Sequence, residues 1–369
     1  MILKKISFSF SKTQVLINKI SAIDSFNGKW QAVEARENKY LKELKRIATI
    51  ESSGSSTRIE GATLTDEETE KLLNNIKISK FVTRDEQEVV GYYQTLELIL
   101  DNYETITISE NYIRQLHSIL LKVSEKDQRH RGEFKKLANK VVAKYPDGTE
   151  KVIFNTTEPH LVEKEMSELI TWINEQLQNQ NIHPLFVIAT FIYEFLSIHP
   201  FQDGNGRLSR LLTTLLMMKS KYDFVQYISF EHIIEENKKK YYKSLMSGQK
   251  NRYKESENIY NWIFFFLTSI ENLIKKLEHK YKKYDSKKSY LNSRQNEFMQ
   301  LLKKHQPLKI SDIATKMNNY SINTLKKDIQ YLLSEKQIEK RYTLLMMKAL
   351  NKSLHIQIER KVYKPTNGW

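Results

Sequence analysis

The 369-residue sequence contains no cysteine, and it has only 10 glycines and 6 prolines. Without cysteine, the chain can form neither a disulfide framework nor a thiolate metal site. Because glycine and proline mark many turns, their scarcity favours long helices over many short strands. No apolar run reaches the roughly 18 residues of a membrane span, and no signal-type segment follows Met1. We therefore expect a cytoplasmic, soluble protein without membrane contact.

The net charge of +15 is concentrated near the C-terminus. From Lys287 onward the chain has 17 Lys and Arg against 6 Asp and Glu, whereas the preceding residues have 42 against 38. A hydrophobic content of 40% indicates a globular protein, and the length predicts two or three domains. Any contact with nucleic acid is therefore expected only from the C-terminal module.

Apolar residues recur at spacings of three and four along most of the chain, which predicts a mainly α protein. Thr65-Asp-Glu-Glu has the N-cap residue and the acidic first turn of a helix start. The Ser-rich stretch 51–57 interrupts the helical pattern, and by itself it is typical of a linker. The predicted helices cover residues 14–32, 33–47, 65–76, 86–103, 109–123, 159–176, 183–198, 208–218, 230–246 and 257–284.

Two short β-like runs, 141–145 and 151–154, flank Pro-Asp-Gly at 146–148. Asp-Gly between such runs predicts a hairpin. In an otherwise helical chain, we expect this hairpin to act as a flap over a site. The predicted domains are an N-terminal helical region (1–84), a helical core with trailing helices (85–285) and a small C-terminal α+β module (286–369).

The C-terminal module has the pattern of a winged helix. Asn323, Lys326 and Lys327 lie near the exposed start of its second helix. Winged helices contact either DNA or protein, and the basic composition is compatible with DNA. The predicted elements are helices at 310–317 and 322–334, followed by strands at 338–342 and 355–363.

The densest cluster of chemically useful residues is His199-Pro-Phe-Gln-Asp-Gly-Asn-Gly-Arg-Leu-Ser-Arg210. It forms a loop between two predicted helices, and its glycines directly precede the second one. Backbone N–H groups and the positive end of a helix dipole converge there, which predicts a phosphate site. His199 is placed to act as a general base, and Asp203 offers a hard oxygen to Mg²⁺.

The remaining motif residues also suit a nucleotide. Gly204 and Gly206 let phosphates approach the backbone, and Asn205 supplies a side-chain donor to an anionic oxygen. Arg207 and Arg210 lie three apart on one helix face and can bind successive phosphates. Each feature alone is common in structural roles, but eight fixed positions together indicate a functional site. No Gly-Lys-Ser/Thr follows the glycines, which excludes a Walker-type loop.

The stretch resembles the signature of the Fic (filamentation induced by cAMP) family, His-x-Phe-x-(Asp/Glu)-Gly-Asn-Gly-Arg-x-x-Arg, at every defined position. The resemblance covers roughly residues 85–250 and implies a Fic-type helical bundle with a β-hairpin flap. Many members have Pro-Pro after the flap, where this chain has Glu158-Pro159. The implied activity is transfer of AMP from ATP to a Ser, Thr or Tyr hydroxyl of a protein.

The resemblance also implies roles for individual residues. His199 would deprotonate the hydroxyl, and Asp203 would hold Mg²⁺. Gly204, Asn205 and Gly206 would form the anion hole, while Arg207 and Arg210 would bind the β- and γ-phosphates. The flap residues Val152, Ile153 and Phe154 would border the ATP site and pair with an extended segment of the target, and Tyr242 and Gln249 would contribute to the adenosine pocket.

The family resemblance changes the interpretation of the Ser-rich stretch. Ser56-Thr-Arg-Ile-Glu60-Gly61 matches the inhibitory motif (Ser/Thr)-x-x-x-Glu-(Gly/Asn) of one class of the family. A carboxylate reaching Arg210 would form a bidentate ion pair and occupy the arginine that the γ-phosphate needs. We therefore predict that Glu60 restrains the transferase.

Two further functions remain open. The chain is alternatively a DNA-binding transcriptional regulator, with the winged helix dominant and the Fic domain subordinate, or the same site removes AMP, with Glu60 orienting water. The sequence leaves open the target protein, automodification, the signal that relieves inhibition, and whether the chain forms a homodimer.

Overall fold

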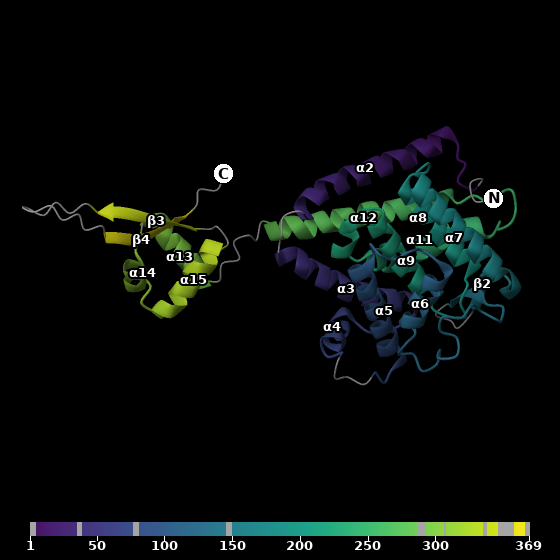
Figure 1. The fold of residues 1–369 in the computed structure, drawn as a ribbon, viewed down its shortest axis with the longest axis horizontal. Coiled ribbons are helices and arrows are strands. Elements are labelled where there is room, and N and C mark those ends of the chain that lie inside the picture. Colours follow the sequence, from purple (N-terminus) through teal and green to yellow (C-terminus); the bar gives the residue numbers. More distant parts are fainter. Residues whose placement is uncertain are drawn as a thin grey trace, which may run out of the picture. The chain divides into compact units, whose positions relative to one another are not determined.

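The computed structural model describes residues 5–34, 39–76, 81–144, 150–285, 293–305, 308–334, 338–345 and 358–365. The chain divides into two compact units, residues 1–282 and 283–369 (Figure 1). Helices dominate the described residues, which confirms the predicted mainly α class. No helix among those described residues is both long enough and apolar enough to cross a lipid bilayer.

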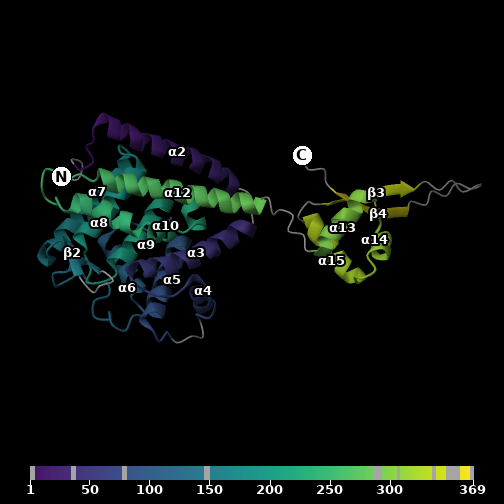
Figure 2. The same cartoon turned by 180° about the vertical axis from the view of Figure 1, so that it is seen from behind.

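The first unit is a bundle of helices with one two-stranded sheet (Figure 2). Most of its helix positions agree with the predicted ranges to within a few residues. Its helical elements are α2 (Phe10–Glu34), α3 (Lys39–Glu60), α4 (Asp66–Asn74), α5 (Arg84–Asn102), α6 (Glu110–Leu120), η1 (Pro159–Leu161), α7 (Val162–Asn179), α8 (Pro184–Ile198), α9 (Asn205–Lys219), η2 (Asp223–Tyr227), α10 (Phe230–Glu236), α11 (Lys238–Gln249) and α12 (Tyr260–Asp285).

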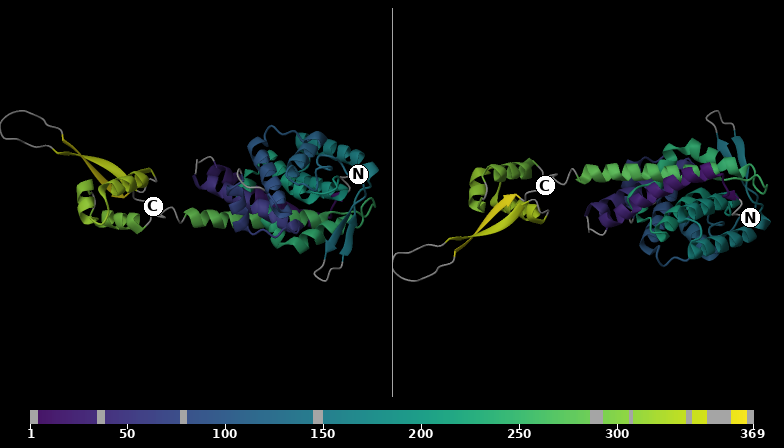
Figure 3. Two further views of the ribbon diagram at one scale, coloured as in Figure 1. Left: turned by 90° about the horizontal axis from the view of Figure 1, so that it is seen from below. Right: turned by 90° about the horizontal axis from the view of Figure 1, so that it is seen from above.

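Helices α8 and α9 form the centre of the bundle. Almost every residue from Leu185 to Ile198 and from Arg207 to Met218 is buried. Helix α8 is apolar almost all round, so it must be covered on every side, and the neighbouring helices provide that cover. Helix α2 runs beside α12, where Lys19 pairs with Glu271 (Figure 3). The loop between α8 and α9 therefore joins two almost completely buried helices.

Thr65 caps α4, as predicted, whereas the predicted interruption at 51–57 is wrong. Thr65 and Glu68 form a complete capping box at the start of α4. The Ser-rich stretch continues α3 to Glu60, with Ser53 and Ser56 fully buried. The hydroxyls of Ser53 and Thr57 donate to the carbonyl four residues earlier, at 2.8 and 3.2 Å respectively. The small side chains let α3 pack closely into the bundle.

The predicted helix at 230–246 is divided at Asn237. Helix α10 ends at Glu236 and α11 begins at Lys238. The Asn237 side chain donates to Ile233 O at 3.0 Å, and its backbone N–H donates to Ile234 O. Asparagine competes well for such local hydrogen bonds, which explains the break in an otherwise continuous pattern.

The two β-like runs form an antiparallel hairpin. Strand β1 (Lys140–Lys144) pairs with β2 (Glu150–Asn155), with an irregularity between Val141 and Val142. The hairpin projects from the helical bundle (Figure 3). Residues 145–149, which include the predicted Pro-Asp-Gly turn, lie outside the described residues.

The second unit has its own small core. Strand β3 pairs antiparallel with β4, and the predicted run at 355–363 begins outside the described residues. The sequence analysis missed α13, whose polar composition hides the buried pair Phe298 and Leu302. The elements are α13 (Ser293–Lys304), α14 (Ile310–Lys316), α15 (Ile322–Ser334), β3 (Ile338–Leu345) and β4 (Ile358–Pro365).

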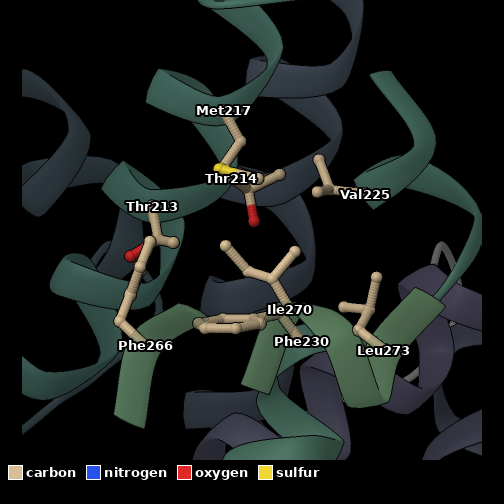
Figure 4. Close-up of a pocket in the computed structure, with 8 residues that line it drawn as sticks. All are labelled: Thr213, Thr214, Met217, Val225, Phe230, Phe266, Ile270 and Leu273. Atoms are coloured by element: carbon tan, nitrogen blue, oxygen red, sulfur yellow. The ribbon is translucent and has the colours of Figure 1, made fainter. Parts of the chain in front are cut away.

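A small cavity lies behind α9, between that helix and α10 and α12 (Figure 4). Its volume is about 10 Å³, which is roughly the space of one water molecule. The lining is apolar apart from two threonines, and Thr213 already donates its hydroxyl hydrogen to Ser209 O. This cavity is a packing gap and is too small for a substrate.

Candidate active site

The loop between α8 and α9 reverses the chain through two residues with left-handed backbone. His199 ends α8 at φ 55°, and its N–H donates to Phe195 O at 2.9 Å. Gly204 precedes α9 at φ 79°, where an added Cβ would lie 3.3 Å from the His117 ring. Glycine satisfies both the backbone conformation and the close approach. The reversal places His199 and the N-terminus of α9 at the same opening.

This opening is a cleft of about 120 Å³ that the motif shares with α3 and α11. Helix α3 contributes Glu60, and α11 contributes Tyr241 and Tyr242. The structure therefore brings the candidate base, the predicted phosphate-binding residues and the predicted inhibitory glutamate into one cleft. The motif residues along its lining are His199, Asp203, Gly204, Asn205, Gly206, Arg207 and Arg210.

His199 is half-buried and neutral. Burial and the nearby charge of Lys135 lower the pKa of His199 to about 4. Its Nδ1 lies 3.4 Å from Leu196 O, and because a carbonyl can only accept, this contact requires the hydrogen on Nδ1. The Nε2 lone pair is then available to take a proton at neutral pH.

Asp203 is ionised and keeps one oxygen accessible. Oδ1 accepts from Gly204 N at 2.6 Å and lies 3.4 Å from Arg207 Nη2. Although burial raises the pKa of Asp203, Arg207, the Gly204 amide and Arg84 lower it below its usual value. Oδ2 accepts no hydrogen bond from the described residues and lies 3.8 Å from Arg84 Nη2.

A magnesium ion fits this carboxylate. The described residues contain no group of three His, Cys, Asp or Glu that could hold a metal by themselves. Mg²⁺ normally binds one or two carboxylates together with substrate phosphates, so it does not need such a group. Asp203 offers the carboxylate, and the neighbouring helix N-terminus would hold the phosphates that complete the donor set.

The Asn205 side chain differs from the predicted anion donor. Its Nδ2 donates to Phe201 O at 2.7 Å, and its Oδ1 accepts from Phe201 N at 2.9 Å. Both polar ends are therefore used by the loop backbone, and only 1% of the residue is exposed. The side chain holds the loop closed, and only the backbone N–H at the start of α9 remains for an anion.

Arg207 is a buried cation with unused donors. Only 2% of its side chain is exposed, and its Nε and Nη1 have no hydrogen-bond partner among the described residues. Nη1 lies 3.5 Å from Glu88, whose Oε1 accepts from Arg84 Nε at 2.7 Å. Together with Asp203, these residues form a ring of alternating charges. The sequence analysis missed Arg84 and Glu88, which belong to α5.

Arg210 is held by the last turn of α3. Its Nη2 donates to Glu60 Oε1 at 2.8 Å and to Ser56 O at 2.9 Å, and its Nε donates to Ser56 Oγ at 2.8 Å. Glu60 therefore contacts Arg210 through one oxygen, whereas we predicted a bidentate pair. A Cβ at Gly206 would lie 2.2 Å from Glu60 Oε1, so only glycine admits this carboxylate. Gly61 ends the helix at φ 110°.

Arg58 fixes the position of the same helix turn. Its Nε donates to Glu235 Oε1 of α10 at 2.7 Å, and its Nη2 donates to Asp66 Oδ1 at 2.8 Å. Its Nη1 also donates to Leu64 O at 2.9 Å. These contacts join α3 to two neighbouring helices. The sequence motif gave no reason to select this arginine.

The predicted adenosine residues lie in two adjacent places. Tyr242 lines the cleft, whereas Gln249 donates to Ser197 Oγ at 3.0 Å and borders a neighbouring groove. That groove has a volume of about 450 Å³ and includes the buried Phe154 at the end of β2. Val152 and Ile153 lie in β2, but their side chains are outside the described part of the structure.

Two buried basic residues brace the loop, and the sequence analysis selected neither. His117 accepts from Gly132 N at Nδ1, so its Nε2 carries the hydrogen that is donated to Asp203 O at 3.0 Å. Its ring stacks on Phe201 at 3.8 Å, and burial lowers the pKa of His117 to about 4. Lys135 contacts the other side of the loop. Neither residue has a sequence pattern that distinguishes it from an ordinary helix or loop residue.

Sequence comparisons with known proteins point to the same family that the motif resembles. The Fic/DOC family model matches residues 107–217. The protein adenylyltransferase Fic of Drosophila grimshawi is 28% identical over 225 residues, which cover 58% of this chain and 44% of the relative. The protein of the same name from Drosophila melanogaster is also 28% identical, over 54% of this chain and 39% of the relative. The chain thus spans less than half the length of these relatives.

The fold comparison reaches a similar result. A Fic family protein from Desulfovibrio desulfuricans G20 has a TM-score of 0.61 at 19% identity, covering 99% of this chain and 98% of that one. At this identity, the likeness concerns the fold alone. With the family match over 107–217 and the motif at its C-terminal end, the prediction of a Fic domain is confirmed. Residues 107–217 of this chain thus match the Fic/DOC family domain.

Proposed function

We propose that the protein transfers AMP from ATP to a hydroxyl group of a protein. The observation that carries the proposal is the cleft itself, which combines a neutral imidazole, a helix N-terminus and two buried arginines. A polyphosphate needs the cations and the backbone N–H groups, whereas a hydroxyl nucleophile needs the base. The names of the curated relatives support the same activity.

The reaction requires one proton transfer and one displacement. The target hydroxyl oxygen forms a bond to the α-phosphorus, and the bond from that phosphorus to pyrophosphate breaks. Nε2 of His199 takes the hydroxyl proton, while Nδ1–H remains hydrogen-bonded to Leu196 O. The backbone at Gly204–Gly206 and the guanidinium groups of Arg207 and Arg210 stabilise phosphate charge. Such sites act mainly through positioning and electrostatics.

Asp203 is the residue that would hold Mg²⁺. When bound, the ion would neutralise charge on the departing pyrophosphate. The chain's own contribution is to keep the Asp203 carboxylate ionised and aimed outward, through the Gly204 amide and Arg207.

We also propose that Glu60 restrains this activity. Its carboxylate forms an ion pair with Arg210 and lies against Gly206, at the place where the phosphates would bind. A negative charge there repels phosphate and removes one of the two arginines from ligand binding. Outward movement of the last turn of α3 would break the ion pair between Glu60 and Arg210, so that Arg210 could bind the nucleotide.

The activity is tested with ATP labelled at either the α- or the γ-phosphate. AMP transfer predicts that protein becomes labelled from α-labelled ATP and not from γ-labelled ATP. Labelling from the γ-phosphate would show a kinase and contradict the proposal. Release of AMP from a protein that already carries it would favour the reverse reaction at the same site.

A second candidate function belongs to the C-terminal unit. The exposed face of α15 carries Asn323, Lys326 and Lys327, while Leu325 and Ile329 are buried on the opposite face. This arrangement suits contact with DNA phosphates. Duplex binding that weakens steeply with salt, and that is lost on Lys326→Ala with Lys327→Ala, would support it. Binding that does not change with salt would exclude it.

A further inference from the structure

Lys135 is a buried ammonium group whose partners are all neutral. Only 3% of the residue is exposed. Its Nζ donates to Thr156 Oγ1 at 2.7 Å, to Asn139 Oδ1 at 2.9 Å and to Ile198 O at 3.2 Å. Among the described residues, no carboxylate lies within ion-pair distance of it. Burying a charge without a counter-ion is costly, so a buried lysine of this kind calls for an explanation.

The three partners of Lys135 connect two different parts of the molecule. Asn139 directly precedes β1 and Thr156 directly follows β2, so together they form the base of the hairpin. Ile198 is the last residue of α8, directly before His199. One ammonium group therefore fixes the base of the hairpin to the carbonyl that precedes the candidate base.

Backbone contacts reinforce the same connection. Lys135 N donates to Pro200 O at 2.8 Å, and Phe134 forms an isolated β-bridge with Phe201. Asn139 Nδ2 donates to Phe201 O at 3.0 Å. The segment from Phe134 to Asn139 thus runs along the motif loop on one side and leads into the hairpin on the other.

We infer that Lys135 is a positioning residue, which fixes the base of the hairpin relative to His199. The inference rests on the proposed function, because it assigns His199 the role of base. Lys135 contacts neither the reacting atoms nor the nucleotide cleft. It acts through Ile198 on one side and through Thr156 and Asn139 on the other.

The charges around both residues agree with this role. Lys135, Glu60 and Asp203 act on His199, and of these only Lys135 disfavours the protonated ring. Burial lowers the pKa of Lys135 to about 8, with Glu158 and Glu165 opposing and Arg252 adding to the decrease. The ammonium group therefore remains mostly charged at pH 7. Its positive charge disfavours protonation of His199, so the neutral ring can accept a proton from the hydroxyl.

The test compares four variants in a Glu60→Gly background. Lys135→Met removes the charge and the three hydrogen bonds, whereas Lys135→Arg keeps a permanent charge. Lys136→Met is the matched control, because Lys136 is the adjacent residue and is exposed. Thr156→Val removes the hydrogen bonds of the Thr156 hydroxyl to Lys135 and Asn139 at the base of the hairpin and leaves the ammonium group in place.

The first measurement is an NMR titration of the His199 ring, assigned with His199→Ala. It does not depend on transfer activity. We expect the titration midpoint of His199 to rise in Lys135→Met toward the ordinary imidazole value of about 6.5. Burial of the ring remains, so the rise is partial. The midpoint should stay low in Lys135→Arg, Lys136→Met and Thr156→Val.

The second measurement is AMP transfer as a function of pH and of target concentration. At pH 6, we expect Lys135→Met to lower kcat by about 10- to 100-fold, the loss that accompanies a misplaced catalytic group. Lys135→Arg should restore most of it, and Lys136→Met should not differ from its parent. Thr156→Val should raise the KM for the target protein more than it lowers kcat.

The outcomes separate the inference from the proposed function. Equal titration midpoints and equal kcat in Lys135→Met and Lys136→Met would overturn the role of Lys135. Loss of kcat that arginine does not restore would likewise contradict it. If the Glu60→Gly parent transfers no AMP, the proposed function fails, while the His199 titration still decides whether Lys135 controls the ring. If Lys135→Met does not fold, Lys135→Arg and Thr156→Val carry the test.

Discussion

The two sides of the cleft are built by different means. The motif side, from His199 to Arg210, is held by hydrogen bonds within the loop, such as those between Asn205 and Phe201, and by nearby buried groups such as His117. The α3 side reaches the cleft from about 150 residues away and is held by side-chain contacts of Arg58, Ser56 and Glu60. A site assembled in this way can keep its chemistry fixed while its restraint is released. In the function that we propose, the motif side would supply the reaction and the α3 side would restrain it.

The largest expected effect belongs to the motif side. His199→Ala should lower AMP transfer by about a thousand-fold, because removal of a general base typically costs two to four orders of magnitude. The comparison is made in the Glu60→Gly background, with label transfer from α-labelled ATP as readout. Activity within a few-fold of the parent would exclude His199 as the base.

The next effect belongs to the α3 side and has the opposite sign. Glu60→Gly should raise AMP transfer by roughly 10- to 100-fold, which corresponds to a charge-assisted hydrogen bond of about 1.5–3 kcal/mol. The same variant should bind ATP more tightly, as measured by calorimetry. Unchanged activity together with unchanged affinity would show that Glu60 is only a helix-end residue.

A smaller increase is expected when α3 is loosened but Glu60 is kept. Arg58→Gln removes the ion pairs to Glu235 and Asp66, and it should raise transfer by about five-fold, the equivalent of roughly 1 kcal/mol. Arg46→Gln is the control, since Arg46 lies on the same helix with exposed partners. If both variants behave alike, the Arg58 contacts do not restrain the helix.

The smallest effect concerns stability and tests how firmly the motif side is held. The folded-state pKa of His117 is about 4, below the value of about 6.5 for an unfolded chain. The unfolded chain therefore binds more protons between these values, and stability falls as the pH decreases through that window. We expect urea unfolding to show a loss of about 2 kcal/mol from His117 between pH 7 and pH 5.

This loss can be assigned to His117 with one variant. His117→Asn should be less stable than the parent at pH 7 but should show a weaker decrease toward pH 5. An unchanged pH dependence in the variant would mean that His117 is not buried in its neutral form.

The sequence predicted the motif side better than the α3 side for a physical reason. Helix periodicity on both sides of the loop and the signature itself are local features, so the base, the glycines and the arginines could be selected without a structure. Asn205 was assigned to an anion because its side-chain partners on Phe201 are a property of the folded loop. A resemblance can identify a residue but does not show which way its side chain points.

The residues that were missed act across long sequence separations. Lys135 reaches Ile198, 63 residues away, and Arg58 reaches Glu235, 177 residues away. No local periodicity encodes such contacts. The composition of the Ser-rich stretch predicts an interruption because such stretches are typical of linkers, yet its small side chains are what the packing of α3 requires. Tertiary packing decided these cases.

We propose that AMP transfer with His199 as the base is restrained by the ion pair between Glu60 and Arg210. It is tested most directly by α-labelled ATP with three proteins, namely the wild-type chain, Glu60→Gly, and Glu60→Gly combined with His199→Ala. We expect little labelling by the first protein, strong labelling by the second and none above background by the third. Equal labelling by the first two proteins, or persistent labelling by the third, would contradict it.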